Sequence, residues 1–308
     1  MRMKAIVATN VGADFREVAT PALLTETDVR VRVHSVSICR TDLYGAEGRL
    51  KVDAGRILGH EFAGVVESTD SDGSLSIGDR VVGHPSLHCN HCRVCRAGAT
   101  HRCADAEFLG LDRDGAFAEL VVLPGWALHR LADEVPFSVG TFAEPVAAGM
   151  AIFEAGLKPH DRVLVYGSSR IARLTGELLA DAGFNKFEIA ADLTGLNSDQ
   201  RFDAIIETCG LGAGMDPLID KLEPGGVLVV KSREPTAIEV PVLNAIRRQV
   251  RIQAVKYGTF EDALAFVERH PDMLATYLDD QWELENFEEA FELARASEDK
   301  KICFKLVD

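Results

Sequence analysis

Four cysteines lie within a stretch of fifteen residues, from Cys89 to Cys103. Their spacing is C-x2-C-x2-C-x7-C, formed by Cys89, Cys92, Cys95 and Cys103. Four thiolates at such short separations can surround one Zn²⁺ tetrahedrally and leave no position open for a substrate. The spacing therefore predicts a structural zinc site in a small lobe. The alternative is a pair of disulfides or four unrelated core cysteines, which the intracellular character of the rest of the chain disfavours.

The composition limits the classes of protein to which the chain can belong. A length of 308 residues with 47% hydrophobic residues favours two domains. The net charge of −15 argues against a nucleic-acid partner. No apolar run has membrane-spanning length, and Met1 to Ala8 is typical of a first strand rather than of a signal peptide. We therefore expect a cytoplasmic protein without a membrane partner, with Cys209 and Cys303 as small core residues.

The first half of the chain is rich in predicted strands. Between Asp28 and Ser37 the apolar Val29, Val31 and Val33 alternate with polar residues, which predicts a half-buried antiparallel strand. Further strands are predicted at 63–67, 80–83 and 117–123. This half should form a β-rich domain.

The pattern changes near Glu144-Pro145, where proline favours the start of a helix that extends to about Gly156. A buried strand, Arg162–Tyr166, then precedes a glycine turn and an amphipathic helix that ends at Gly183. Further strands are predicted at 187–191, 202–208, 226–231 and 251–255, with a helix between the strands at 202–208 and 226–231. Such alternation predicts an α/β unit with a parallel, doubly wound sheet.

Helices and one final strand follow Gly258. Asn286 and Glu289 fit a capping box at the start of a helix over Phe287–Ala296. Its apolar face should comprise Phe287, Ala290, Phe291 and Ala294.

Three fragments beside the cysteine lobe carry a family resemblance: Ile38-Cys39-Arg40-Thr41-Asp42, Gly59-His60-Glu61-Phe62-Ala63-Gly64 and Phe142-Ala143-Glu144-Pro145. In this order the sequence resembles the zinc-dependent medium-chain dehydrogenase/reductase superfamily, particularly its polyol, threonine and glucose dehydrogenase-like branch. The resemblance implies a GroES-like catalytic domain over 1–148 and 270–308, to which the strand near Lys301–Leu306 returns. It also implies a Rossmann-type dinucleotide-binding domain over 149–269.

The resemblance also implies a catalytic zinc, so that each chain would hold two zinc ions. Cys39 and His60 correspond to ligands, and Glu144 corresponds to the third. Glu61 matches a glutamate that either coordinates the metal or lies just outside its ligand shell. Thr41 matches the hydroxyl that relays the substrate proton.

The residue chemistry agrees with this set. A thiolate, an imidazole and a carboxylate leave a fourth zinc position open, where an alcohol would lose its proton more readily than in water. Coordination by Glu61 as well would weaken the Lewis acid, so we expect Glu61 to exchange with water or substrate. Taken singly, Cys39, His60 and Glu61 fit a buried small residue, a core histidine and a surface charge equally well.

Four histidines near the lobe also invite interpretation as ligands: His84, His88, His91 and His101. Since four cysteines already complete the nearby metal shell, we expect these histidines to be solvated lobe residues.

The glycine turn departs from the dinucleotide fingerprint G-x-G-x-x-G. Its three positions are Gly167, Ser169 and Ala172, and Ser169 places a side chain where the pyrophosphate should approach. The Ser169 hydroxyl and Arg170 could instead bind the phosphates at the helix N-terminus. We expect the cofactor to contact 167–171, which comprises Gly167, Ser168, Ser169, Arg170 and Ile171.

Asp192, 25 residues beyond Gly167, should accept hydrogen bonds from the adenosine ribose, although an alignment shifted by one residue would put Ala191 there. Only ten steps separate Asp192 from Phe202, which is too short for another strand and its crossover helix. One strand-helix unit is therefore expected to be missing, with strand order 2-1-4-5-6. An acidic residue without a following basic one favours NAD over NADP as the cofactor.

Three hypotheses for function follow. The leading hypothesis is a zinc alcohol dehydrogenase that transfers hydride between a polar secondary alcohol, such as a polyol, sugar or amino alcohol, and NAD(P). The second is a zinc enzyme of redox-neutral chemistry, a lyase, isomerase or epimerase, with a retained or absent nicotinamide cofactor. The third is a non-catalytic scaffold. Relatives of this kind commonly pair through the cofactor sheet, so a homo-oligomer with a small-molecule substrate is expected.

Overall fold

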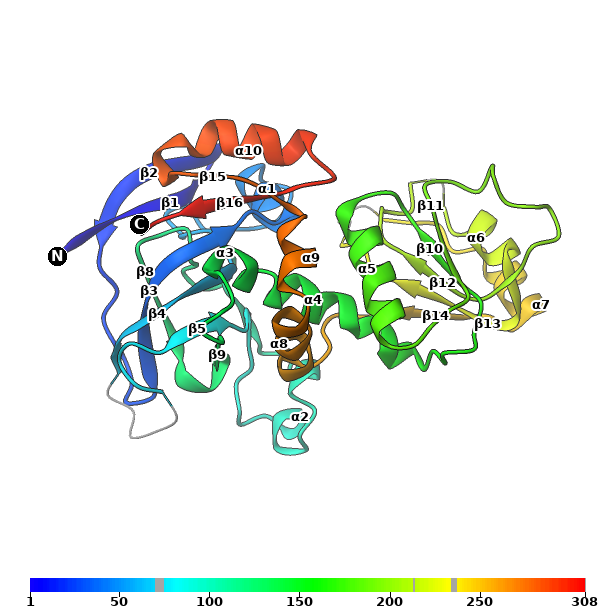
Figure 1. Ribbon diagram of the computed structural model, residues 1–308, viewed down its shortest axis with the longest axis horizontal. Helices are drawn as coiled ribbons and strands as arrows, with labels where there is room; N and C mark the ends of the chain where they lie inside the picture. The colour runs from blue at the N-terminus through cyan, green and yellow to red at the C-terminus, as the bar shows by residue number, and fades with distance from the viewer. Residues whose placement is uncertain (70–74, 213, 234–236, 308) are drawn as a thin grey trace. The chain divides into compact units, whose positions relative to one another are not determined.

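A computed structural model describes residues 1–69, 75–212, 214–233 and 237–307 of the chain. The chain divides into two compact units. Met1–Val146 and Phe260–Asp308 form the first unit, and Ala147–Thr259 forms the second. The ribbon in Figure 1 shows that the carboxyl-terminal strand β16 lies among strands from the amino-terminal half. The first unit is therefore built from two separate parts of the sequence.

The helix α8 (Phe260–Arg269) marks the difference between these units and the expected domain bounds. The sequence placed it in the dinucleotide-binding domain. In the structure, Phe260 packs its ring on His84 and His129 of the first unit, at centroid distances of 4.6 and 5.1 Å. These aromatic contacts explain why α8 belongs with the first unit.

The first unit is organised around a seven-stranded sheet with the order β15-β16-β3-β4-β5-β9, in which β8 also pairs with β3. Its strands are β3 (Asp28–Ser37), β4 (Glu61–Thr69), β5 (Arg80–Gly83), β8 (Leu120–Pro124), β9 (Leu128–Arg130), β15 (Leu278–Trp282) and β16 (Lys301–Lys305). Two small sheets accompany it: β1 (Arg2–Thr9) with β2 (Gly12–Ala19), and β6 (Ser86–Leu87) with β7 (Glu107–Phe108).

Strand β3 lies at the centre of this sheet and confirms the predicted alternation. Val29, Val31 and Val33 are fully buried, whereas Arg32 is exposed. Since β16 and β4 flank β3 on its two sides, residues from the two ends of the sequence meet at the Ser37 end of β3.

Short helices complete the first unit: α1 (Arg40–Ala46), α2 (Arg93–Arg96), α3 (Phe137–Gly140), α9 (Pro271–Ala275) and α10 (Phe287–Ala296). Single 3-10 turns lie at η1 (Thr100–Arg102), η2 (Gly125–Ala127) and η4 (Leu284–Asn286). Helix α10 is confirmed, and Phe287, Ala290 and Phe291 are buried. The capping box predicted for it is wrong, because Asn286 makes no side-chain hydrogen bond at the helix start. The preceding 3-10 turn η4 already ends at Asn286 and leads directly into α10.

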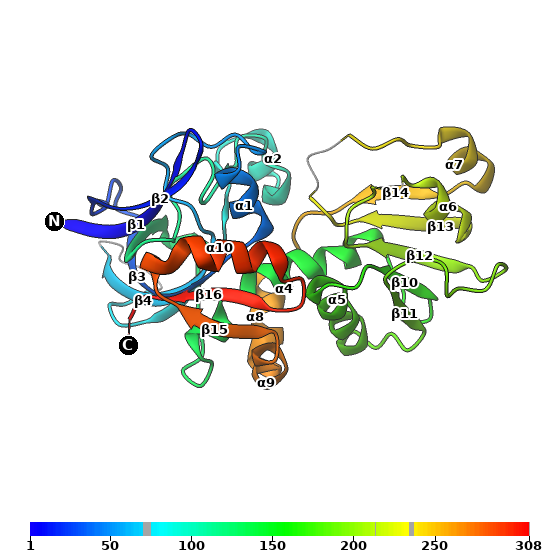
Figure 2. The same ribbon diagram turned by 90° about the horizontal axis from the view of Figure 1, so that it is seen from above.

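The second unit contains a five-stranded parallel sheet with the order β11-β10-β12-β13-β14 (Figure 2). Its elements are α4 (Ala143–Met150), which starts in the first unit, η3 (Ala151–Ala155), β10 (Val163–Tyr166), α5 (Arg170–Asp181), β11 (Phe187–Ala190), β12 (Phe202–Glu207), α6 (Asp216–Asp220), β13 (Leu222–Val230), α7 (Val242–Arg248) and β14 (Arg251–Ala254). The predicted strand order 2-1-4-5-6 is confirmed. The second strand of the unit, β11, forms an edge of the sheet.

The connection between β11 and β12 occupies the place of the missing strand-helix unit. Leu193 and Leu196 in this loop pack against a core cluster that includes Leu164 and Phe202. Lys221 donates hydrogen bonds to the carbonyl groups of Asn197 and Ser198 in the loop, with Nζ to O distances of 2.7 and 3.4 Å. The short loop thus covers part of the core that a crossover helix would otherwise cover.

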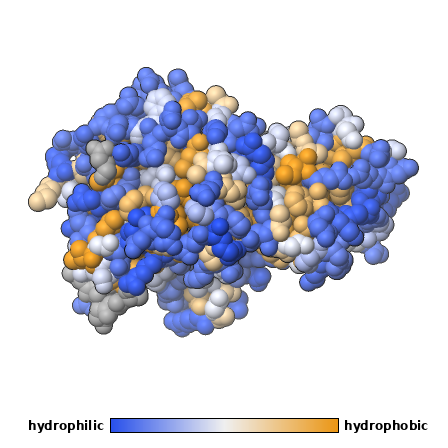
Figure 3. Space-filling model, viewed as in Figure 1, coloured by the Kyte–Doolittle hydropathy of each residue, from blue (hydrophilic) through white to orange (hydrophobic). Residues whose placement is uncertain are grey.

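Polar residues cover most of the face shown in Figure 3. Among the helices that the structure describes, none combines the length and the apolar character needed to cross a bilayer. Cys303 is fully buried, as expected, but Cys209 is exposed. The core prediction for Cys209 is wrong because this residue lies in the loop after β12 rather than in the strand itself.

Candidate functional site

Three potential metal ligands meet where β3 ends and β4 begins. Cys39 is the N-cap residue of α1, His60 immediately precedes β4, and Glu61 is the first residue of β4. Ser37 pairs with Glu61 across the two antiparallel strands, which brings the segments together. One ligand atom from each of Cys39, His60 and Glu61 lies within 4.8 Å of the other two. The donors are a sulfur, a nitrogen and an oxygen, each of a type that zinc binds in proteins.

His60 has one ring nitrogen bound and one available. Its Nδ1 lies 3.1 Å from Oδ1 of Asp42, whereas its buried Nε2 has no hydrogen-bond partner among the described residues. Both side chains are fully buried. A carboxylate on Nδ1 fixes a ligating histidine in the tautomer whose Nε2 lone pair is free for a metal. The unpartnered Nε2 therefore supports a metal site at this position.

Asp42 also organises the backbone around the ligands. Its Oδ2 accepts a hydrogen bond from the Cys39 backbone N–H at 2.9 Å, and its Oδ1 accepts one from Gly59 at 3.1 Å. Gly59 has a φ of +92°, and a Cβ on it would lie 2.5 Å from the Phe117 ring. Glycine is therefore required before His60, because a side chain there would collide with Phe117 and displace the backbone N–H that donates to Asp42.

The buried charges of this group interact strongly. Burial lowers the pKa of His60, but the negative charges of Asp42 and Cys39 outweigh it and raise that pKa well above its ordinary value. Burial raises the pKa of Glu61, while the Lys301 ammonium opposes this and Glu144 adds to it. Lys301 and Glu61 form a buried ion pair. A metal-free chain would therefore carry a proton on His60 that a zinc ion must displace.

The structure places Glu144 and Thr41 near this group without joining them to it. Glu144 is buried in the first turn of α4 and interacts electrostatically with Glu61. Among the described residues, however, the set whose ligand atoms all lie within 4.8 Å of one another contains Glu61 and not Glu144. Thr41 is buried in the first turn of α1. The ligand role of Glu144 and the relay role of Thr41 stay predictions.

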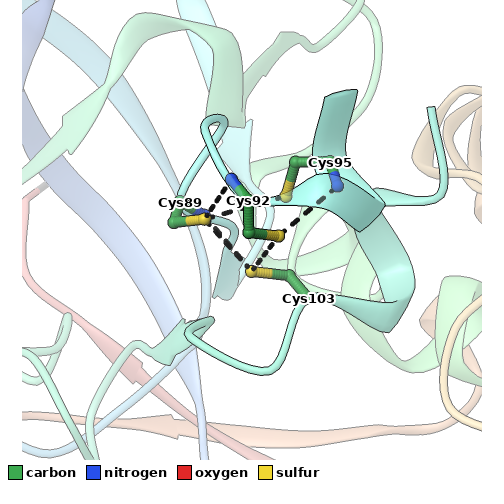
Figure 4. A group of neighbouring side chains, drawn as sticks. All are labelled: Cys89, Cys92, Cys95 and Cys103. Atoms are coloured by element: carbon green, nitrogen blue, oxygen red, sulfur yellow. Dashed lines mark hydrogen bonds between the residues drawn. The ribbon is translucent and has the colours of Figure 1, made fainter. Parts of the chain in front are cut away.

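The four cysteines of the lobe converge on one point (Figure 4). The Sγ atoms lie 3.9 Å apart for Cys89 and Cys95, 4.0 Å for Cys92 and Cys103, and 3.6 Å for Cys103 and Cys89. With a Zn–S bond of about 2.3 Å, a regular tetrahedron separates its sulfur atoms by about 3.8 Å. None of the four cysteines forms a disulfide. The lobe therefore fits one zinc ion with no open position.

The histidines near the lobe fall into two classes. His91 and His101 are exposed, as expected. The prediction that His84 and His88 are solvated is wrong, because both side chains are partly buried against aromatic rings. His84 lies 4.6 Å from the Phe260 ring, and His88 stacks on Trp126 at 4.0 Å between centroids. None of the four belongs to a metal-binding group among the described residues.

The glycine turn of the second unit connects β10 to α5. Gly167 has a φ of +140°, and a Cβ on it would lie 2.3 Å from the Thr208 hydroxyl oxygen, so only glycine fits. Ala172 is fully buried on α5, close to Gly167, as the third fingerprint position requires. Ser169 is the N-cap residue, and its side chain makes no capping hydrogen bond. Ser168, Ser169, Arg170 and Ile171 therefore surround a helix N-terminus whose first N–H groups can bind an anion.

Asp192 lies just after β11, at the carboxyl edge of the sheet, where the sequence placed it. One of its oxygens, Oδ1, accepts hydrogen bonds from the Thr194 backbone N–H at 2.8 Å and from the Thr194 hydroxyl at 2.5 Å. These bonds lower the pKa of Asp192, so this exposed carboxylate is ionised at neutral pH. Whether it binds a ribose stays a prediction.

Comparison with known proteins relates both units to one group of enzymes. Residues 25–133 match the alcohol dehydrogenase GroES-like domain. L-threonine 3-dehydrogenase of Aeromonas hydrophila is 25% identical over 95% of each chain. A zinc-binding dehydrogenase of Sinorhizobium meliloti, solved with NADP, superimposes with a TM-score of 0.89 at 22% identity over 99% of this chain and 100% of that chain. Galactitol-1-phosphate dehydrogenase of Escherichia coli superimposes with a TM-score of 0.84 at 21% identity over 99% and 100%.

Residues 25–133 thus carry an alcohol dehydrogenase GroES-like domain, and the relatives and solved structures match nearly the whole chain, as a zinc-dependent medium-chain dehydrogenase/reductase fold would. The resemblance inferred from the sequence is thereby confirmed, as is the GroES-like and Rossmann-type architecture. The chain is accordingly an oxidoreductase of the alcohol dehydrogenase type.

Two residues of this site were missed in the sequence analysis, Asp42 and Lys301. Asp42 stands in the fragment that carried the resemblance, and its position three residues after Cys39 places it one turn into α1, facing the Cys39 backbone. Lys301 gave no signal, because only the pairing of β16 with β3 brings it to Glu61.

Proposed function

We propose that this chain is a zinc-dependent dehydrogenase that transfers hydride between a polar secondary alcohol and NAD or NADP. The carrying observation is the group of Cys39, His60 and Glu61, in which the buried His60 presents an unpartnered Nε2 while Asp42 holds its Nδ1. A buried imidazole nitrogen without a partner is costly unless a ligand binds it. The four-cysteine lobe, with its complete shell, would supply the second zinc site.

Cys39 and His60 would hold the catalytic metal, with Glu61 or Glu144 as the carboxylate ligand. Zinc bound there would act as a Lewis acid that lowers the pKa of a substrate hydroxyl. Asp42 would keep the His60 ring oriented and raise its basicity as a ligand. The geometry of these residues supports the first two ligands directly and leaves the carboxylate to be identified by experiment.

The chain must also remove the proton of the substrate hydroxyl. The Thr41 hydroxyl, one residue from Asp42 on α1, is the proposed acceptor, and it would pass its own proton outward. The Arg170 side chain and the N-terminal N–H groups of α5 would bind the cofactor pyrophosphate, and the Asp192 carboxylate would bind the adenosine ribose. A bound nicotinamide would accept the hydride from the carbon that carries the hydroxyl.

The substrate class rests on the names of the relatives. L-Threonine and galactitol 1-phosphate each contain a secondary hydroxyl beside another polar group. A polyol, a sugar or an amino alcohol is therefore the proposed substrate class.

The test is to incubate the purified protein with NAD⁺ or NADP⁺ and a panel of polyols, sugars and L-threonine, while cofactor reduction is followed by absorbance. We expect reduction with at least one member of the panel, and none with a His60→Ala variant. The matched control is His101→Ala, which changes an exposed histidine of the lobe and should retain activity. Absence of both cofactor reduction and cofactor binding, the latter measured by calorimetry, would contradict the proposal.

The absent strand-helix unit favours a second candidate. With less sheet to bind a freely exchanging cofactor, the chain could be a zinc-dependent lyase, isomerase or epimerase, in which a nicotinamide is either retained and reoxidised within each cycle or absent. Mass spectrometry of the denatured protein separates the two candidates. A stoichiometric nicotinamide nucleotide released on denaturation would favour the second, and a cofactor-free chain that reduces added NAD⁺ would favour the first.

A further inference from the structure

Lys301 and Glu61 form an ion pair inside the first unit, where each side chain has a relative exposure of only 2%. Lys301 is the first residue of β16, and Glu61 is the first residue of β4. Among the described residues of the first unit, no other lysine or arginine is buried to this degree. Burial of a cation costs desolvation free energy, so the position of Lys301 beside a candidate metal ligand needs an explanation.

Strand register brings the two residues together. Ser37 of β3 pairs with Cys303 of β16 on one side and with Glu61 of β4 on the other. Paired residues of antiparallel strands point to the same face, and the Ser37 oxygen indeed lies 3.0 Å from the Cys303 sulfur. Lys301 lies two residues before Cys303 and therefore points to this face as well. The strand register therefore places the Lys301 ammonium group beside the Glu61 carboxylate.

Negative charge accumulates around the candidate metal centre. Asp42 bonds to His60, Glu61 belongs to the ligand group, and Glu144 is close enough to interact with Glu61 electrostatically. With the Cys39 thiolate, these three carboxylates exceed the charge of one zinc dication. A carboxylate with no other cation beside it would be drawn onto the metal and would close its open position.

We propose that Lys301 is a positioning residue that holds the Glu61 carboxylate away from permanent coordination, so that the position beside Cys39 and His60 stays available to the substrate. The inference rests on the proposed function, because it requires a metal at this group. Through Lys301, β16 would take part in a site whose other residues come from the first half of the sequence. Glu61 then has two competing cationic partners, the metal and Lys301.

The experiment compares four forms of the full chain: wild type, Lys301→Met, Glu61→Gln and the double variant. Co²⁺ is exchanged into the Cys39 site, with zinc retained in the lobe and the metal content checked by elemental analysis. Cobalt absorption bands weaken when a further ligand joins a four-coordinate site, and they shift in wavelength when a carboxylate replaces bound water. Lys305→Met, on the same strand and partly exposed, is the matched control for β16.

In Lys301→Met we expect cobalt bands that are shifted or weaker than in wild type. In the zinc form, metal release to chelator should be slower by about tenfold, the lower end of the range for changes in residues around metal ligands. Glu61→Gln should restore the wild-type spectrum in the double variant. A metal-loaded, folded Lys301→Met protein with the spectrum and release rate of wild type would overturn the proposal.

A second comparison remains decisive if Lys301→Met does not fold. Once Glu61 is neutral, Lys301 has no carboxylate to hold, so Glu61→Gln and the double variant should have the same cobalt spectrum. A difference between them would overturn the proposal. Failure of the proposed function has a different signature, because wild type would then take up no cobalt outside the cysteine lobe.

Discussion

The two candidate metal groups of this chain depend on the fold to different extents. The cysteine lobe carries all of its ligands between Cys89 and Cys103, on α2, η1 and the turns beside them. The group of Cys39, His60 and Glu61 forms only where β3 and β4 pair, and its charge is matched by Lys301 from β16. The spacing of the cysteines is therefore enough to predict a metal site whose four ligands are all protein residues. A site with a position open for substrate also depends on supporting residues, which sequence spacing does not reveal.

The two groups also differ in their surroundings. In the first group only Cys39 is partly exposed, and His60, Asp42 and Glu61 are buried. In the lobe only Cys95 is buried, and the other three cysteines are partly exposed. Charges interact more strongly away from water, so the buried group suits chemistry and the lobe suits cross-linking of the chain.

The largest expected effect comes from the imidazole ligand. His60→Ala should reduce activity by more than about 10³-fold, because a Lewis acid supplies several kcal/mol and each 1.36 kcal/mol is about tenfold in rate. Steady-state kinetics and zinc analysis test this. The lobe should keep its zinc. A His60→Ala variant that keeps both zinc ions and near-normal activity would contradict the role of His60 as a ligand of the catalytic metal.

Removal of the charge that orients His60 should have a smaller effect. Asp42→Asn is expected to weaken zinc binding at the buried group by about 10- to 100-fold, as changes beside metal ligands commonly do. Competition with a chelator of known affinity measures this change. Asp133→Asn, at an exposed position before α3, is the control, and equal zinc affinity in the two variants would refute the orienting role of Asp42.

Zinc binding at the buried group should depend on pH. The raised pKa of His60 means that its imidazole carries a proton in the metal-free chain, and this proton must leave when zinc binds. Below that pKa, zinc affinity should therefore rise by about tenfold per pH unit for each proton released. Calorimetry in two buffers of different ionisation enthalpy counts the protons. Zinc binding to wild type without proton release would contradict the role of His60.

The smallest effect on chemistry is expected from the lobe. Cys95→Ser should remove the lobe zinc and lower the free energy of unfolding by about 1 to 3 kcal/mol, while the chemistry at Cys39 and His60 persists below the melting temperature. Thermal unfolding and activity assays at low temperature measure the two effects separately. Cys209→Ser, an exposed cysteine outside both groups, is the control. Loss of the buried zinc in Cys95→Ser would show that the two sites are not independent.

Much of the fold was predictable because it depends on local patterns. The alternation of Val29, Val31 and Val33 predicted β3, and the ten steps from Asp192 to Phe202 predicted the strand order of the second unit. Contacts between distant residues were not predictable. Phe260 joins α8 to the first unit through aromatic stacking, and Asn286 fails to cap α10 because a 3-10 turn precedes it.

The candidate site shows the same limit. Cys39, His60 and Glu61 stand in recognisable fragments, and the structure brings them together. Asp42 stands in one of these fragments, but its role appears only when its oxygens are seen on Cys39, Gly59 and His60. Lys301 could not be found from periodicity, because it lies far along the chain from Glu61 and only sheet register connects them.

A metal count on three forms of the chain tests the central claim most directly. Elemental mass spectrometry of purified wild type, His60→Ala and Cys95→Ser should give two zinc ions per wild-type chain and one per variant chain, with dehydrogenase activity lost only in His60→Ala. A wild-type chain that holds a single zinc ion, kept by His60→Ala and lost by Cys95→Ser, would contradict the account.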